Sequence, residues 1–163
     1  MQKTDNPANG MQKTDMFAMQ AALSEARAAA AEGETPIGAV LMHNGEVIAT
    51  ARNHREGKND VTSHAEMEVL RQAGRLKGDW RLADCTLYVT LEPCPMCAGA
   101  ILAARVGRVV FGAKDATMGA MGSVLNLPRY PLGAKPKVEG GLLEEECREL
   151  LQTFFRERRR SKA

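Results

Sequence analysis

The sequence lacks an apolar run long enough to cross a membrane, and no signal-peptide pattern opens it. Its four cysteines do not form the framework of a disulfide-rich secreted domain. Two of them, Cys85 and Cys147, fit buried hydrophobic positions instead. The formal net charge is only +2, which is too small to indicate nucleic-acid binding by itself. Together these features predict a cytoplasmic globular protein that does not enter a membrane.

Length and composition predict one domain. A chain of 163 residues, of which 44% are hydrophobic and 26% are charged, can bury a substantial core. The segment MQKTD at residues 1–5 recurs at residues 11–15. One short copy cannot build a stacked repeat architecture. We therefore expect residues 1–13 to be a disordered extension and residues 14–163 to form the domain.

Helix and strand patterns alternate along the chain. Asp15 can cap an alanine-rich helix that extends to Glu32, and Gly33 is typical of a helix end. The Asn44-Gly45 pair predicts a hairpin turn. The expected strands are residues 37–42, 46–51, 86–90, 108–112 and 135–138. Further helices are expected at residues 63–74, at residues 95–105 and from Leu143 toward the C-terminus. The predicted loops are residues 53–62 and 113–134.

This order of elements predicts an α/β fold. Strands that alternate with helices favour a sheet covered on both faces. Because the first two strands form a hairpin, the sheet should be mixed rather than all parallel. The expected architecture is therefore a three-layer α/β/α sandwich with a mixed five-stranded sheet.

His64, Cys94 and Cys97 offer one imidazole and two thiolates to a metal ion. Three protein ligands leave the fourth position of a zinc ion free for reactive water, whereas a structural zinc site usually has four. Glu66 lies two residues after His64 and can move the protons of such a water. The pattern His-x-Glu followed later by Pro-Cys-x-x-Cys is the signature of zinc deaminases.

The spacing of these residues predicts where they lie. Cys94 and Cys97 are three residues apart, so they share one face of a first helical turn. His64 and Glu66 are two residues apart and would point in different directions in the middle of a helix. They can serve one site at a helix start, which the preceding cap-forming residues Asp60, Thr62 and Ser63 predict. Both helix starts would then direct their positive ends toward the metal.

The separate parts of this motif have other interpretations. Ser63 and Glu66 fit a capping box, in which the glutamate accepts a hydrogen bond from a backbone amide. Cys94 and Cys97 fit a redox dithiol or half of a structural zinc site. However, Cys147 stands alone, so no later Cys/His pair completes a structural site. The combined motifs favour a catalytic metal centre, while the capping interpretation of Glu66 remains open.

Residues 86–100 (TLYVTLEPCPMCAGA) closely resemble the bacterial tRNA adenosine deaminases, which form inosine at the wobble position of the anticodon. Residues 35–40, 109–115 and 119–123 resemble the same family. The resemblance extends from about residue 15 to the C-terminus. It implies the cytidine deaminase fold, a homodimer and one zinc ion in each subunit.

The resemblance also implies roles for individual residues. His64, Cys94 and Cys97 would bind Zn²⁺, and Glu66 would be the general acid and base. The residues placed around the flipped adenine and its sugar are Pro36, Ile37, Asn53, the Ala65 backbone and Asp115. The residues placed against the RNA are Arg55, Lys114 and Phe155 of the final helix.

One stretch departs from the family pattern. Many members carry an Asn-His pair shortly before the last strand, where this chain has residues 129–136 (RYPLGAKP). The family's substrate contact from that loop is therefore not carried over to this chain. Val61 also stands where a proline is common.

The predicted function is zinc-dependent hydrolytic deamination of adenosine to inosine in a tRNA anticodon stem-loop, with release of ammonia. One alternative is a zinc deaminase of free nucleosides or nucleobases such as cytidine or guanine, because zinc ligands do not select the base. A second alternative is a zinc-stabilised RNA-binding module without catalysis.

Overall fold

The computed structural model describes residues 7–162 and, among them, the side chains from Lys13 onward. This part of the chain contains one sheet of five strands in the order β2-β1-β3-β4-β5. Strand β1 is antiparallel to β2 and β3, whereas β4 is parallel to β3 and β5. The predicted mixed five-stranded sheet is confirmed. The strands are β1 (Gly38–His43), β2 (Glu46–Arg52), β3 (Cys85–Leu91), β4 (Arg108–Ala113) and β5 (Lys137–Gly140).

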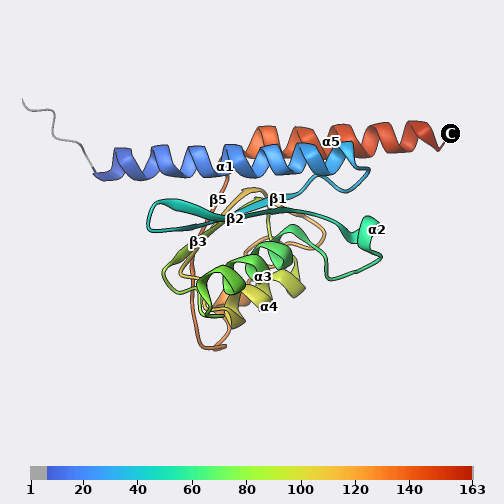
Figure 1. The fold of residues 1–163 in the computed structure, drawn as a ribbon. Helices are drawn as coiled ribbons and strands as arrows, with labels where there is room; N and C mark the ends of the chain where they lie inside the picture. The colour runs from blue at the N-terminus through green and yellow to red at the C-terminus, as the bar shows by residue number, and fades with distance from the viewer. Residues whose placement is uncertain (1–6, 163) are drawn as a thin grey trace, which may run out of the picture.

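Helices cover both faces of the sheet (Figure 1). The long helices α1 and α5 lie along one face, and α3 and α4 lie on the other, which confirms the predicted three-layer α/β/α sandwich. No helix in the described part of the chain has the length and apolar composition that crossing a membrane requires. The helices are α1 (Pro7–Ala31), α2 (Arg55–Lys58), α3 (Ala65–Lys77), α4 (Pro95–Ala103) and α5 (Glu144–Ser161), with a short 3-10 helix η1 (Leu127–Arg129).

Strand β1 contributes to two hydrophobic cores because its side chains alternate between the faces of the sheet. Ala39 and Leu41 pack in the core that includes α3 and α4. Val40 and Met42 pack in the core that includes α1 and the start of α5. A Cβ atom on Gly38 would lie 1.9 Å from the carbonyl oxygen of Ala22, so glycine is required where α1 crosses the start of β1. This close packing fixes the end of β1 that lies nearest the site described below.

Asp15 anchors α1 to the sheet. The Arg108 guanidinium donates to both carboxylate oxygens of Asp15, at 2.8 and 2.9 Å. The Tyr88 hydroxyl donates to the same carboxylate at 2.5 Å, and Arg108 also donates to Glu139 at 2.8 Å. The hydrogen bond from Arg108 lowers the pKa of Asp15, whereas burial raises the pKa of Tyr88. One cluster of charged and polar groups thus joins α1 to β3, β4 and β5.

Helix α1 begins at Pro7, so the predicted start at Asp15 is wrong. Residues 7–13, predicted to be disordered, belong to this helix, and residues 1–6 of the same prediction lie outside the described residues. Proline suits the first turn of a helix, and straight-chain residues such as Gln12 and Lys13 favour helix. Asp15 is consequently an interior helix residue rather than a cap.

Helix α3 extends beyond its predicted end at Gly74 and stops at Lys77. Gly78, which follows with φ 66°, adopts the left-handed conformation typical of a helix end. Gly74 is a tolerated interior glycine, because the residues between it and Lys77 are good helix formers.

The predicted loop at residues 53–62 contains the one-turn helix α2. The Glu34 carboxylate accepts hydrogen bonds from the backbone amides of Glu56 at 3.1 Å and Gly57 at 2.6 Å. A distant acceptor therefore stabilises this turn, so local sequence does not reveal it. The predicted loop at residues 113–134 likewise contains η1.

Candidate metal centre and active site

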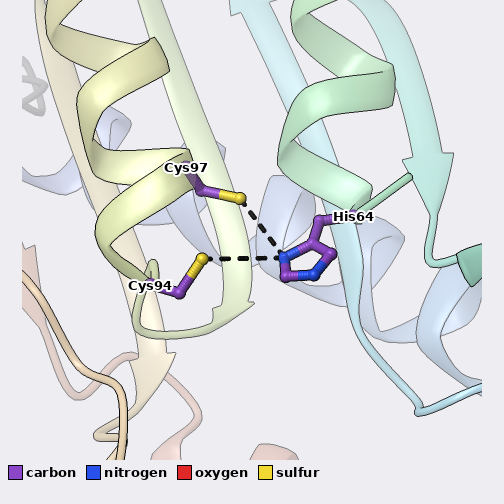
Figure 2. Close-up of side chains that lie close together, drawn as sticks. All are labelled: His64, Cys94 and Cys97. Atoms are coloured by element: carbon purple, nitrogen blue, oxygen red, sulfur yellow. Dashed lines mark hydrogen bonds between the residues drawn. The ribbon is translucent and has the colours of Figure 1, made fainter. Parts of the chain in front are cut away.

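One imidazole nitrogen and two sulfur atoms come together between α3 and α4 (Figure 2). Nδ1 of His64 lies 3.7 Å from Sγ of Cys94 and 3.5 Å from Sγ of Cys97. In a tetrahedral zinc site, nitrogen and sulfur ligands are about 3.5 Å apart, given bonds of about 2.0 Å to nitrogen and about 2.3 Å to sulfur. The three side chains therefore form a metal site with dimensions that fit zinc.

Two helix starts position these ligands. His64 immediately precedes α3, and Cys94 immediately precedes α4, with Pro95 as the first helical residue. Cys97 lies in the first turn of α4 and points toward the same imidazole nitrogen as Cys94 (Figure 2). Backbone amides without intrahelical partners give both helix starts a partial positive charge. That charge stabilises thiolates and any anion bound between the two helices.

Glu66 lies in the first turn of α3 and is only 4% exposed. Its Oε1 atom has no hydrogen-bond partner among the described residues. Burial raises the pKa of this carboxyl above its ordinary value. Because buried polar atoms are nearly always hydrogen-bonded, the unpaired oxygen points to a partner that binds at this site. A carboxyl so placed is suited to exchange protons with that partner.

The capping-box interpretation of Glu66 is wrong. Within the described residues, no side-chain hydrogen bond caps the start of α3. The Ser63 hydroxyl donates instead to the carboxylate of Glu68 at 2.7 Å. Glu66 therefore does not form a capping box with Ser63, and its Oε1 atom is left without a partner among the described residues.

The two sulfur atoms of the site differ in their affinity for protons. A hydrogen bond from the Cys97 thiol, with a further contribution from His64, lowers the pKa of Cys94 to about 4. The same hydrogen bond and burial raise the pKa of Cys97. Cys94 is consequently a thiolate at neutral pH, which is the form in which cysteine binds a metal.

The remaining two cysteines are buried, as predicted. Cys85 is 2% exposed and Cys147 is 1% exposed. Burial raises the pKa of Cys85 to about 11 and that of Cys147 to about 12. Both stay protonated at neutral pH and act as small hydrophobic residues.

Strands β1, β2 and β3 have chain ends at the end of the sheet where the metal site lies. Because β1 is antiparallel to β2 and β3, its first residue lies beside the last residues of both neighbours. The amide of Asn53, just after β2, donates to the carbonyl of Ile37, just before β1, at 3.2 Å. Asn53 is buried, and its side-chain oxygen accepts from the amide of Arg55 at 3.3 Å. The predicted adenine-binding residues Pro36, Ile37 and Asn53 thus gather at this end of the sheet.

Comparisons with known proteins agree with this geometry. The model of the MafB19-like deaminase family matches residues 12–159. The tRNA-specific adenosine deaminase of Bacillus subtilis is 50% identical over 149 residues, which cover 91% of this chain and 92% of the relative. The enzyme of the same name from Streptococcus pyogenes serotype M1 is 42% identical, with 90% of this chain and 86% of the relative covered. The chain belongs to the tRNA-specific adenosine deaminase family.

A solved structure of this family has the same fold. It comes from a study of A-to-I editing by tRNA:A34 deaminases at the wobble position of transfer RNA. The two chains are 46% identical and superpose with a TM-score of 0.81, over 83% of this chain and 99% of the other. The predicted cytidine deaminase-like fold is confirmed by this similarity.

The structure brings together some of the residues that family resemblance assigns to RNA. Lys114, just after β4, and Phe155 of α5 line one surface pocket of about 430 Å³ together with Arg148, Arg156 and Arg159. Arg55 is exposed in α2 and does not line this pocket. Asp115 is half-buried, and its carboxylate accepts hydrogen bonds from the amides of Thr117 at 2.9 Å and Met118 at 3.1 Å.

The loop that departs from the family pattern extends to the opposite end of α4 from the metal ligands. Leu132, Gly133 and Ala134 line a surface pocket with Arg105, which follows the C-terminal end of α4. Cys94 precedes the N-terminal end of the same helix. This part of the loop therefore lies beside Trp80 and Arg105 rather than beside the metal site.

Two buried carboxylates near the site have no role in the sequence analysis. Glu34 and Glu92 are each 2% exposed. Glu34 accepts hydrogen bonds from backbone amides of helix α2, and Glu92 accepts them from backbone amides of the loop that follows β4. The signal for Glu92 was its position between an apolar strand and Pro93-Cys94, where a charged residue is unusual. The partners of the two carboxylates were not recognisable from the sequence, because they are backbone amides of residues far away along the chain.

Proposed function

We propose that this protein deaminates adenosine to inosine at the wobble position of a tRNA anticodon loop and releases ammonia. The observation that carries this proposal is the buried Glu66, whose Oε1 atom has no hydrogen-bond partner among the described residues, beside the His64, Cys94 and Cys97 group. Membership of the tRNA-specific adenosine deaminase family supports the substrate. The domain responsible is proposed to be residues 14–163.

The metal is proposed to be Zn²⁺, one ion in each subunit, bound by His64, Cys94 and Cys97. The separations of the ligand atoms and the choice of two sulfurs and one nitrogen support zinc. When bound, zinc supplies an activated water by lowering its pKa toward neutrality. Because the protein offers three ligands, the fourth position is available for that water.

Glu66 is proposed to carry the protons of the reaction. It accepts a proton from the attacking water and delivers that proton to N1 of adenine. It then accepts the proton of the hydroxyl that has been added at C6 and delivers it to the amino group, which leaves as ammonia. A carboxyl with a raised pKa returns its proton more readily at neutral pH than an exposed glutamate does. Its burial also excludes bulk water that would compete for these transfers.

The substrate base is proposed to enter between the strand ends that surround the metal site. A stacked base cannot reach a buried metal, whereas an anticodon loop presents unstacked bases at little cost. Asn53 has a fixed side-chain orientation because its oxygen accepts the amide of Arg55. We propose that Asn53 and the Ala65 backbone hydrogen-bond the adenine, that Pro36 and Ile37 pack near its ring, and that Asp115 lies beside its sugar.

The RNA backbone is proposed to follow Arg55 and the basic pocket between Lys114 and α5. Lys114, Arg148, Arg156 and Arg159 concentrate positive charge there, and Phe155 offers an exposed ring on which a base can stack. The basic residues supply sequence-independent attraction for phosphate. Since the substrate is tRNA, the cytoplasm is the proposed location.

A homodimer is proposed through an apolar groove between α3 and α4. The groove measures about 920 Å³. Its apolar lining includes Met67, Leu70, Trp80, Ala100 and Ala103. Trp80 is 53% exposed in the single chain, and large exposed apolar side chains on such a surface are typical of interfaces. Sedimentation of the purified protein tests this assembly.

The proposed function is tested by ammonia release from a tRNA anticodon stem-loop and from free adenosine, cytidine and guanine. We expect release from the stem-loop alone, with inosine read as guanosine at the wobble position. Release only from a free nucleoside or base would identify a small-molecule deaminase. Tight RNA binding without ammonia release, together with four protein ligands to zinc by X-ray absorption spectroscopy, would identify a non-catalytic RNA-binding module.

A further inference from the structure

The carboxylate of Glu92 is bound by four donors of one loop. Its Oε2 atom accepts from the backbone amides of Met121 and Ser123, each at 3.1 Å. Its Oε1 atom accepts from the amide of Asp115 at 3.3 Å and from the Ser123 hydroxyl. An ionised carboxylate has about four lone-pair sites, so these donors occupy its hydrogen-bonding capacity.

Glu92 stands at a junction between this loop and the metal site. Its own amide donates to the carbonyl of Ala113 at 2.9 Å, which places it at the end of the β3–β4 ladder. Two residues later the chain reaches Cys94, which precedes α4. The carbonyl of Pro93, the residue between Glu92 and Cys94, accepts a hydrogen bond from the amide of Ala120 at 2.9 Å. The backbone that supports a metal ligand is thus joined directly to the loop over residues 115–123.

Gly119 packs closely against the carboxylate, so a larger residue there would require a shift of its neighbours. A Cβ atom on Gly119 would lie 2.3 Å from Oε2 of Glu92 and 2.5 Å from the carbonyl oxygen of Asp115. Gly119 also accepts the amides of Val124 at 2.9 Å and Leu125 at 3.1 Å, so the loop folds around this point. The loop therefore owes its shape to a buried side chain of another strand rather than to regular secondary structure.

We propose that Glu92 is a positioning residue that holds the 115–123 loop, and with it Asp115, at a fixed place beside the metal-binding start of α4. This inference rests on the proposed function, in which Asp115 lies beside the sugar of the target nucleotide. Glu92 does not contact the substrate. It acts by setting the distance between the loop that binds the nucleotide and the site where the base reacts.

Glu92→Gln is the most direct test, because it keeps the size of the side chain and replaces one acceptor oxygen with an NH₂ donor. That donor would face amide donors, so the loop must move away from the carboxamide. Steady-state kinetics on the anticodon stem-loop should show KM raised on the order of tenfold, with kcat changed much less, since binding is the affected step. Metal content should stay the same as in the unsubstituted protein. Glu46→Gln, an exposed residue at the start of β2, is the matched control and should change neither constant.

Hydrogen exchange separates this proposal from the proposed function. In Glu92→Gln, the amides of residues 115–123 should exchange faster, whereas those of α3 should not change. Unchanged exchange in the loop would overturn the inference even if activity fell. Faster exchange with an unchanged KM would also overturn it, because the loop would then be irrelevant to substrate binding. Failure of the unsubstituted protein to deaminate the stem-loop would overturn the proposed function. The exchange measurement would still test whether Glu92 holds the 115–123 loop.

A milder pair of variants covers the case in which Glu92→Gln does not fold. Ser123→Ala removes one of the four donors and should raise KM in the same direction by a smaller factor. Ser24→Ala changes an exposed serine of α1 and serves as its control. Equal KM values in these two variants would count against the proposal.

Discussion

Nδ1 of His64 lies 3.5 Å from Sγ of Cys97, although 33 residues separate them in the sequence. The contact exists because α3 and α4 start at the same end of the sheet, where the C-terminal end of β3 leads into Cys94. A metal bound there would tie these two helix starts together. The catalytic geometry and the packing of one face of the sheet are therefore linked.

Replacing Glu66 with Gln should lower kcat about 100- to 10,000-fold, because a positioned proton-transfer group contributes that much. Metal content should not change, since Glu66 is not among the three grouped ligands. Ammonia release and elemental analysis measure the two quantities. Glu46→Gln serves as a control of equal charge change on the exposed start of β2. Turnover retained in Glu66→Gln would remove this residue from the mechanism.

Removing the metal with a chelator should abolish deamination and lower Tm, because a ligand that binds only the native state stabilises it. Adding zinc back should restore both. Cys97→Ser should lose most of the metal, whereas Cys85→Ala, which alters a buried cysteine outside the metal site, should retain it. A Cys97→Ser protein that keeps one equivalent of zinc would contradict the proposed ligand set.

Asp15→Asn should destabilise the protein at neutral pH by about 1.5–3 kcal/mol, the range for a hydrogen bond to a charged group. Asp15 and Arg108 are only 15% and 17% exposed, so solvent weakens this pair little. Asp84→Asn is the control, because Asp84 is 55% exposed and its ion pair with Lys77 should contribute less. Urea denaturation measures both differences, and equal values would contradict a special role for the Asp15 cluster.

The same pair predicts a pH dependence. Arg108 lowers the folded-state pKa of Asp15 below the ordinary value of 3.8. A lowered folded-state pKa gives stability that is fully present above 3.8 and is lost as the pH falls through the folded-state pKa. The stability difference between the unsubstituted protein and Asp15→Asn should therefore be constant near neutrality and shrink below pH 3.8. A difference that grew in acid would refute this assignment.

Lys114→Ala should weaken binding of the anticodon stem-loop and reduce the slope of log affinity against log salt by about 1, as expected for one lost phosphate contact. Lys137→Ala is the matched control. Lys137 lies on β5 opposite Arg108, at the start of β4, whereas Lys114 follows the end of β4. Fluorescence anisotropy over a salt series measures both slopes. Identical slopes for the two variants would place the RNA elsewhere on the surface.

The metal ligands and their helix starts were predictable because their signals are local. Cys94 and Cys97 share a face through three-residue spacing, and His64 follows residues that favour helix starts. The hairpin likewise follows from a short-range pattern, the Asn44-Gly45 turn. The role predicted for Asn53 came from the family resemblance, because the residues around Asn53 in the sequence do not indicate a function.

The shapes of the two loops near the site were not predictable, because distant carboxylates set them. Glu34 stabilises α2 across 22 residues, and Glu92 binds Ser123 across 31. Neither pairing leaves a pattern in composition or periodicity, since the donors are mainly backbone amides that every residue carries. The early start of α1 was missed for a different reason, since Asp15 resembles a cap but binds Arg108.

The cluster that joins Asp15 to Arg108 lies at the start of β4, about 16 Å from the end that leads to Lys114, given about 3.3 Å per residue along a strand. The predicted stabilising cluster and the proposed substrate contacts thus lie at opposite ends of the same strands. Substitutions around Asp15 and Arg108 can therefore raise the stability of the fold without altering the residues near the metal site. Substitutions near the metal site can in turn change the preferred nucleobase without disturbing that cluster.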